Sequence, residues 1–115
     1  PGTALFDFGD MMRTMCCPAD EEETDLTRVV IDTTLVTALF EGYLDGTEDV
    51  LVPRERENLF LAGMVITFEQ AVRFLADHLQ GDVYYHTARP GHNLDRCRNQ
   101  LALLESMHTL SETWT

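Results

Sequence analysis

The residues best suited to chemistry lie between positions 73 and 96, around glycines that mark turns. They are arginines, carboxylates, histidines, tyrosines and one asparagine, namely Arg73, Asp77, His78, Asp82, Tyr84, Tyr85, His86, Arg89, His92, Asn93, Asp95 and Arg96. Carboxylates, amides and guanidinium groups pair with hydroxyl groups, and an aromatic ring packs on the apolar face of a sugar. The cluster therefore favours a sugar site. The alternative is structural: Arg73 and Asp77, four residues apart on one helix face, form a surface ion pair.

Other kinds of site find less support in the sequence. The Asp7-Phe8-Gly9 triplet matches the magnesium-binding triplet of protein kinases, but only six residues precede it, too few for a loop carrying a catalytic base. The four histidines lack the spacing of metal ligands, so we expect no metal site. Three cysteines are an odd number, which predicts reduced thiols, and Cys97 is expected to be a small buried residue of the core.

The composition narrows the class of protein and of partner. The chain has 115 residues, with 44% hydrophobic and 24% charged, which is typical of a single globular domain spanning 1–115. The net charge of −12 argues against a nucleic-acid or anionic-membrane partner. All eight basic residues are arginine, so a nucleotide site that needs a lysine cannot lie within the chain. No export signal or continuous membrane-spanning apolar run is evident, and we expect a cytoplasmic protein.

Hydrophobic periodicity predicts an all-α fold, an irregular bundle of four or five helices. The first helix is expected to begin near Asp7 and to end before Pro18, and a solvated acidic connection follows over 19–25. A second helix should run from Asp32 to Gly46, and a third from Pro53 to Gly81 with a kink or break at 67–70.

The C-terminal part of the chain is expected to be an ordered loop followed by a helix. Residues 82–87 have a strand-like composition but no evident partner strand, so we interpret them as a loop. Asn93 is expected to cap the last helix. The side chains expected to face the core from that helix are Leu94, Cys97, Leu101, Leu104 and Met107.

Three segments together resemble a known family of enzymes: PGTALFDFGDMMRT, ADEEETDL and RFLADHLQGDVYYHTARPGHNLDRCRNQ. They are similar to the C-terminal part of aminoglycoside phosphotransferase-like kinases, in the phosphotransferase enzyme family branch that includes N-acetylhexosamine 1-kinases and so-called mucin-desulfatase proteins. The resemblance covers almost the whole chain. It implies the C-terminal helical subdomain of a two-lobed, kinase-like parent that transfers the γ-phosphate of ATP to the anomeric hydroxyl of an N-acetylhexosamine.

The resemblance also implies roles for individual residues. The catalytic base and the metal ligand would precede Pro1, so this chain alone would contain no catalytic residue, and ATP and Mg²⁺ would serve only the full-length parent. Asp7 would support the catalytic loop as a buried aspartate. Substrate-binding candidates are Arg73, with Asp77, Asp82 and Tyr84 nearby. Two further residues would hold the loop onto the last helix, Asn93 and Arg96. The family has Thr and Tyr where this chain has Ala76 and His78, which leaves the sugar's identity open.

Two further interpretations stay open. The chain could be a stand-alone acidic helical domain that binds a partner or dimerises through an exposed apolar face. It could also derive from an aminoglycoside or choline kinase relative, whose cationic substrates suit an acidic chain, although an arginine at Arg73 would disfavour a cation. If a missing N-terminal lobe once covered part of the surface, the isolated chain should form a homo-oligomer.

Overall fold

The computed structural model describes residues 2–47 and 53–113. The helices are α1 (Gly2–Met15), α2 (Thr33–Thr47), α3 (Pro53–Leu79) and α4 (His92–Thr113), with a short 3₁₀ helix, η1 (Leu26–Arg28), between α1 and α2. The predicted all-α fold is confirmed, and within these ranges no residue forms a strand. Residues 82–87 form a loop, as expected.

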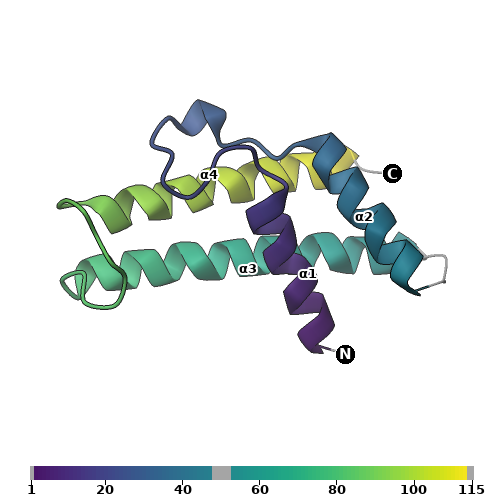
Figure 1. Cartoon of the computed structure of the whole chain (residues 1–115), viewed down its shortest axis with the longest axis horizontal. Coiled ribbons are helices and arrows are strands. Elements are labelled where there is room, and N and C mark those ends of the chain that lie inside the picture. The colour runs from purple at the N-terminus through teal and green to yellow at the C-terminus, as the bar shows by residue number, and fades with distance from the viewer. Residues whose placement is uncertain (1, 48–52, 114–115) are drawn as a thin grey trace.

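The two long helices form the frame of the molecule. Helices α3 and α4 lie side by side in opposite directions and are joined by the loop at 80–91 (Figure 1). Helix α1 crosses α3, and α2 lies near the N-terminal end of α3. The segment between α1 and α2 runs over α4, so α4 is packed between this segment and α3.

Helix α1 crosses α3 at very short range because glycines stand at the crossing. A Cβ atom added to Gly9 would lie 2.6 Å from the carbonyl oxygen of Ala62, and one added to Gly63 would lie 2.6 Å from Met12 Sδ. The close approach lets α1 insert Phe8 and Met12, both fully buried, into the core.

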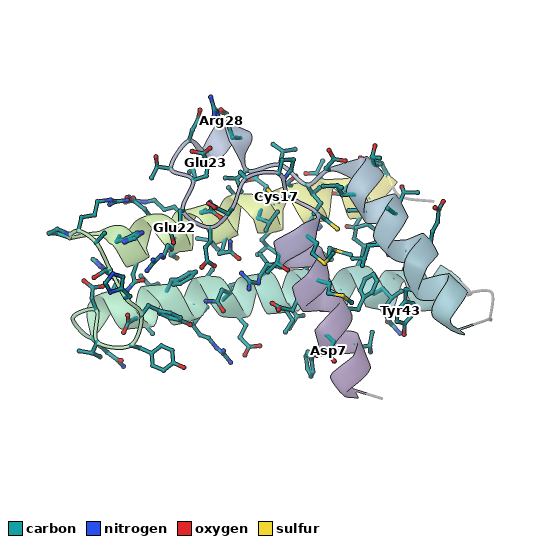
Figure 2. The ribbon with its side chains drawn as sticks, in the orientation of Figure 1. Asp7, Cys17, Glu22, Glu23, Arg28 and Tyr43 are labelled. Carbon is teal, nitrogen blue, oxygen red and sulfur yellow. The ribbon has the colours of Figure 1, made fainter. Side chains whose placement is uncertain are left out.

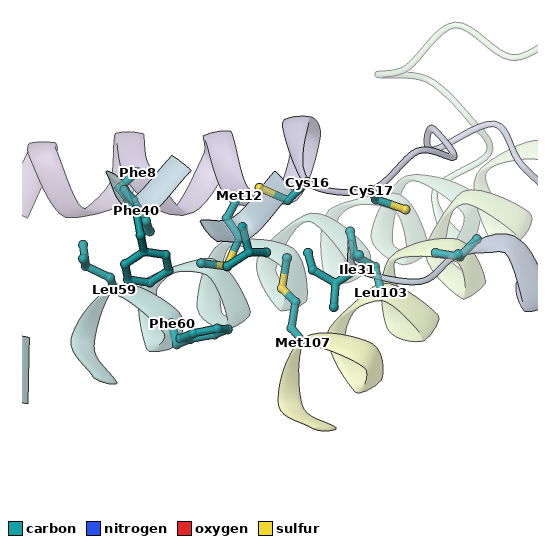
Figure 3. Close-up of a cluster of buried hydrophobic side chains, with 12 residues drawn as sticks. Phe8, Met12, Cys16, Cys17, Ile31, Phe40, Leu59, Phe60, Leu103 and Met107 are labelled. Atoms are coloured by element: carbon teal, nitrogen blue, oxygen red, sulfur yellow. The ribbon is translucent and has the colours of Figure 1, made fainter. Parts of the chain in front are cut away.

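The main core joins all four helices (Figure 3). The Phe8 ring packs edge-on against Phe40 and Tyr43, with ring centroids 5.2 and 5.3 Å apart. The buried side chains of this cluster are Phe8, Met12, Cys16, Cys17, Val29, Ile31, Val36, Phe40, Leu59, Phe60, Leu103 and Met107. A second, smaller cluster of Ala71, Phe74 and Cys97 lies between α3 and α4, so Cys97 is a buried core residue as predicted.

Most helix boundaries follow the expected signals. Asp32 caps α2, since its Oδ1 accepts the N–H of Leu35 at 3.0 Å, and Pro53 is the first residue of α3. Helix α1 begins at Gly2, earlier than the predicted start near Asp7. The kink or break allowed at 67–70 does not occur: Thr67 is buried within a continuous α3, and its hydroxyl donates to the Gly63 carbonyl at 2.7 Å.

The predicted core face of α4 is partly wrong. Cys97 and Met107 are buried as expected, but Leu103 is buried instead of Leu101, which is 44% exposed. Two positions expected in the core, Leu94 and Leu104, are only half-buried. The cause is the second neighbour of α4: the 19–25 segment covers a polar strip of the helix, and the buried face widens toward it.

Helix α3 also passes a length and composition test for a membrane span. An 18-residue window within Glu57–Leu79 has a mean hydropathy of 1.5, although Glu69 and Arg73 interrupt its apolar run. Such helices also occur in the cores of soluble proteins, and one face of α3 is buried against α1 and α4.

Candidate binding site at the α3–α4 loop

Asp77 organises the loop that follows α3. Its side chain is only 3% exposed, and its Oδ1 accepts the N–H of Tyr84 at 2.8 Å. Its Oδ2 accepts the N–H of Tyr85 at 3.0 Å and the Nδ2–H of Asn93 at 2.7 Å. The carboxylate predicted to contact a substrate is therefore occupied by the chain itself, and it forms no ion pair with Arg73.

These contacts stabilise Asp77 in its charged form. Burial alone raises the pKa of this carboxyl, but the N–H groups of Tyr85 and Tyr84 and the amide of Asn93 lower it more, so the net pKa lies below its ordinary value. A carboxylate with several N–H donors is an anchor for a loop, and it needs no counter-ion.

Asp82 completes the turn at the end of α3. Its backbone has a φ of 61°, in the left-handed region, and its N–H donates to the Asp77 carbonyl at 2.8 Å. Its Oδ1 accepts a hydrogen bond from Asn93 Nδ2 at 3.0 Å. Asp82 is thus a half-buried turn residue held by the same asparagine as Asp77.

Asn93 and Arg96 hold the loop onto α4, as the resemblance implied. Arg96 Nη1 donates to the His86 carbonyl at 2.8 Å and to Asn93 Oδ1 at 3.0 Å, and its guanidinium lies 5.7 Å from the centre of the Phe74 ring. The predicted capping role of Asn93 is wrong, because α4 begins at His92 and the buried Asn93 side chain points to Asp77 and Asp82.

The acidic segment at 19–25 contacts two residues of the first turns of α4, His92 and Arg96, and the sequence did not predict these contacts. Glu22 Oε1 accepts Arg96 Nε–H at 2.8 Å, and its other oxygen meets Nε2 of His92, whose Nδ1 accepts the N–H of Ala88 at 3.0 Å (Figure 2). Asn99 Nδ2 donates to two backbone carbonyls of the segment, those of Asp20 and Glu23. The segment at 19–25, here called the strap, therefore packs against α4 and is not only a solvated connection. No local sequence pattern indicates contacts between residues so far apart in the chain.

Two of the four predicted substrate-binding residues remain accessible. The Tyr84 side chain is 80% exposed, and its ring meets the Tyr85 ring edge-on at 4.8 Å between centroids. Tyr85 itself is anchored, since its hydroxyl accepts from Gln70 Nε2 at 3.1 Å. The Arg73 side chain is 61% exposed and pairs with Glu69 at 2.7 Å, so the alternative interpretation of an Arg73–Asp77 pair is wrong, although a surface ion pair does form.

Asp7 lies away from this loop. Figure 2 shows it toward the N-terminal end of α1, and its side chain is exposed while its neighbour Phe8 is buried. The aspartate implied to be buried is therefore exposed in this chain. Its role in supporting a catalytic loop stays a prediction about the full-length parent.

The part of the chain that the structure describes contains no group of three or more His, Cys, Asp or Glu side chains close enough to hold a metal ion. Within it the three cysteines are buried and unpaired. No family model matches the chain. The strongest site candidate is therefore geometric: an exposed tyrosine and an exposed arginine beside a loop whose backbone is fixed by Asp77, Asn93 and Arg96.

Proposed function

We propose that this chain is the substrate-binding helical portion of an ATP-dependent sugar kinase acting on N-acetylhexosamines, and that it has no activity by itself. The observation that carries the proposal is that Tyr84 combines a fixed backbone with an exposed side chain. Asp77 holds its backbone N–H at 2.8 Å while the side chain stays 80% exposed. Arg73, one helical turn before Asp77, is also exposed.

The two exposed side chains have complementary uses for a sugar. The face of the Tyr84 ring can pack on the apolar face of a pyranose, and the Arg73 guanidinium can donate to ring hydroxyls or to the acetamido oxygen. Because the loop backbone is already fixed, a ligand has little loop ordering entropy to overcome. The positive charge of Arg73 favours a neutral sugar over a cationic aminoglycoside or choline.

The sequence lacks one of the groups that phosphoryl transfer in kinases requires. Transfer from ATP needs a base, metal ligands and, in kinases, a lysine on the phosphates, and this sequence has no lysine at all. By the resemblance, the base and the metal ligand belong to the parent upstream of Pro1, where ATP and Mg²⁺ would also bind. The proposed role of this portion is to position the sugar, which is a large part of the catalysis in such enzymes.

The first experiment is a titration of the ¹⁵N-labelled chain with N-acetylglucosamine and N-acetylgalactosamine. We expect shifts in the Tyr84 and Tyr85 amides and in the Arg73 side chain, with weak affinity, because half of the site is absent. Tyr84→Ala and Arg73→Ala should each abolish the shifts, whereas Val83→Ala, at an exposed neighbour in the same loop, should not. Shifts that survive both substitutions, or that are absent up to about 100 mM sugar, would contradict the proposal.

A second experiment concerns activity. The isolated chain incubated with ATP, Mg²⁺ and an N-acetylhexosamine should form no sugar phosphate, and product formation by the chain itself would refute its proposed inactivity. The gene upstream of Pro1 should encode an HxDxxxxN loop and a metal-binding aspartate. The full-length product should then phosphorylate the sugar, and Tyr84→Ala should impair it.

A different function, partner binding through an apolar face, has its own supporting observation. The surface of α3 that faces away from α1 and α4 carries large exposed apolar side chains. This surface does not include Tyr84, so the two functions can coexist and can be tested separately.

A further inference from the structure

Helix α3 has two apolar faces. The inner face is buried against α1 and α4 and includes Phe60, Gly63, Thr67, Ala71 and Phe74. A second face, about 120° around the helix from the inner face and here called the outer stripe, consists of six side chains that are 38–76% exposed: Leu61, Val65, Phe68, Val72, Leu75 and Leu79. A helix that is apolar on both sides is normally enclosed by protein on both sides.

The spacing of the outer stripe is that of a coiled-coil seam. The intervals are four, three, four, three and four residues, so the six positions alternate as a and d of a heptad repeat over 61–79. With Val65, Val72 and Leu79 at a, and Leu61, Phe68 and Leu75 at d, the seam is prepared for the knobs-into-holes packing of another helix.

We propose that the outer stripe is a self-association surface, which binds the same stripe of a second copy of this chain in antiparallel orientation. This inference goes beyond the proposed sugar-kinase function and does not depend on it. The two-fold axis would pass between Phe68 and Val72. The contact would be isologous, the commonest arrangement in soluble homodimers.

The antiparallel register fills every layer of the seam. Leu61 meets the partner's Leu79, and Val65 meets the partner's Leu75. Phe68 meets the partner's Val72, so the largest side chain of the stripe faces one of the smallest. No polar residue falls in any layer, so none is buried without a partner.

The charges beside the stripe do not select the direction. In the heptad Glu69 is an e position and Arg73 a b position, and the e flanks of two antiparallel copies face each other, so Glu69 would lie near the partner's Glu69. The ion pair of Glu69 with Arg73 within each helix, at 2.7 Å, offsets part of that repulsion. The antiparallel direction therefore rests on the match of large and small side chains in the layers.

The area of the stripe is sufficient for a weak, specific dimer. Six large side chains, each about half exposed, present on the order of 500 Å² per copy, or roughly 1,000 Å² for the pair. That total is at the lower limit of stable interfaces, so a dissociation constant in the micromolar range is expected. In Figure 1, α4 runs along one side of α3 and α1 crosses it, and the exposure of the six side chains shows that neither covers the stripe.

Sedimentation velocity of the whole chain between about 1 and 200 µM tests the proposal. We expect a shift from monomer to dimer with concentration. Phe68→Glu and Val72→Glu, each placing a charge in the seam, should weaken association at least about 100-fold. Leu101→Glu, at a similarly exposed position on α4, should leave the dimer intact. Circular dichroism of each variant shows whether the fold is kept.

Glu69 tests the direction of the helices. Glu69 faces the partner's Glu69 only in the antiparallel register, whereas in a parallel register it faces the partner's Met64. Glu69→Gln should therefore tighten an antiparallel dimer more than Glu41→Gln, an exposed control on α2 that removes the same charge. Equal effects of the two substitutions contradict the antiparallel register.

The other outcomes overturn the proposal. A monomer at every concentration, or a dimer that persists in the Phe68→Glu and Val72→Glu variants, excludes the stripe as a self-association surface. A monomer that floats with phosphatidylcholine vesicles would assign the stripe to a membrane instead, a use that the length and apolarity of α3 would permit. Sugar binding is read at the Tyr84 and Tyr85 amides, so its success or failure is independent of all these results.

Discussion

Asp77 and Asn93 join the end of α3 to the first turn of α4 through a buried hydrogen bond of 2.7 Å from Asn93 Nδ2 to Asp77 Oδ2. The same carboxylate holds the backbone of Tyr84 and Tyr85, and the same amide holds Asp82. One pair of side chains therefore joins the ends of two helices and fixes the course of the loop that carries the candidate site.

Replacing the carboxylate should loosen this loop. Asp77→Asn keeps the shape of the side chain but exchanges one acceptor oxygen for an N–H₂ group, which would face N–H donors. We expect the melting temperature to fall by about 5–10 °C, measured by circular dichroism.

The matched control is Asp95→Asn. Asp95 forms surface ion pairs with Arg89 at 2.7 Å and Arg98 at 3.4 Å, and such exposed pairs contribute about 0–1 kcal/mol. Equal effects of the two substitutions would show that the buried position of Asp77 is unimportant.

Glycines at the α1–α3 crossing should tolerate no side chain. Gly9→Ala would place a Cβ 2.6 Å from the Ala62 carbonyl oxygen, a backbone atom that cannot move without shifting a helix, so we expect a loss of about 1–3 kcal/mol in the free energy of unfolding. Gly63→Ala should cost less, because its nearest atom is the flexible end of Met12.

Gly42→Ala provides the opposite control for denaturant unfolding. A Cβ there meets no atom within 4 Å, and Gly42 is exposed within α2, so the substitution should stabilise the chain by about 0.5–1 kcal/mol. A stable Gly9→Ala variant would mean that α1 does not cross α3 as closely as described.

The strap residue Glu22 should make stability depend on pH. Burial raises the pKa of its carboxyl. Hydrogen bonds from Arg96 and His92 and the charge of Arg96 lower the pKa by more than burial raises it, so the net pKa lies below the ordinary 4.5. A lowered carboxyl pKa means that the contribution to stability is present above pH 4.5 and is lost as the pH falls through the folded-state value.

Comparing the Glu22→Gln variant with the unsubstituted chain measures that contribution to stability. At pH 7 the variant should be less stable by up to about 1 kcal/mol, a modest value because the Glu22 side chain is 45% exposed, and the difference should vanish at low pH. Glu41→Gln, at an exposed position of α2, corrects for the general loss of charge. A difference that grows as the pH falls would reverse the assigned sign.

The cysteines should react slowly while the chain is folded. Burial, with the nearby charge of Asp32 and the neighbouring Cys17, raises the pKa of the Cys16 thiol from 9.0 to about 11, which means about 100-fold less thiolate at a given pH. Burial also raises the pKa values of Cys17 and Cys97. Labelling with Ellman's reagent at pH 8 should therefore be slow in buffer and complete in guanidinium, and fast labelling of the folded chain would contradict the buried arrangement.

Local patterns in the sequence determined the helical class and several boundaries. The apolar spacing of 35–44 follows the helical period, Asp32 is a side chain that caps, and Pro53 fits only the first turn of a helix. These signals depend on neighbours within about four residues, so they can be interpreted without knowledge of the tertiary structure. The association of Asn93 and Arg96 with the loop also followed from the sequence, through the resemblance, and the contacts to Asp82 and His86 confirm it.

Tertiary structure alone decided which side chains meet. Glu22 and Arg96 stand 74 positions apart, and their ion pair turned an apparently solvated acidic run into a strap. Leu103 is buried instead of Leu101 because it lies on the side of α4 that joins the core cluster with α1 and the segment that follows α1. The apolar periodicity of α3 indicates a side that includes Phe68, Val72, Leu75 and Leu79, yet these side chains are exposed. Only packing against α1 and α4 selected the inner face and left the outer stripe exposed.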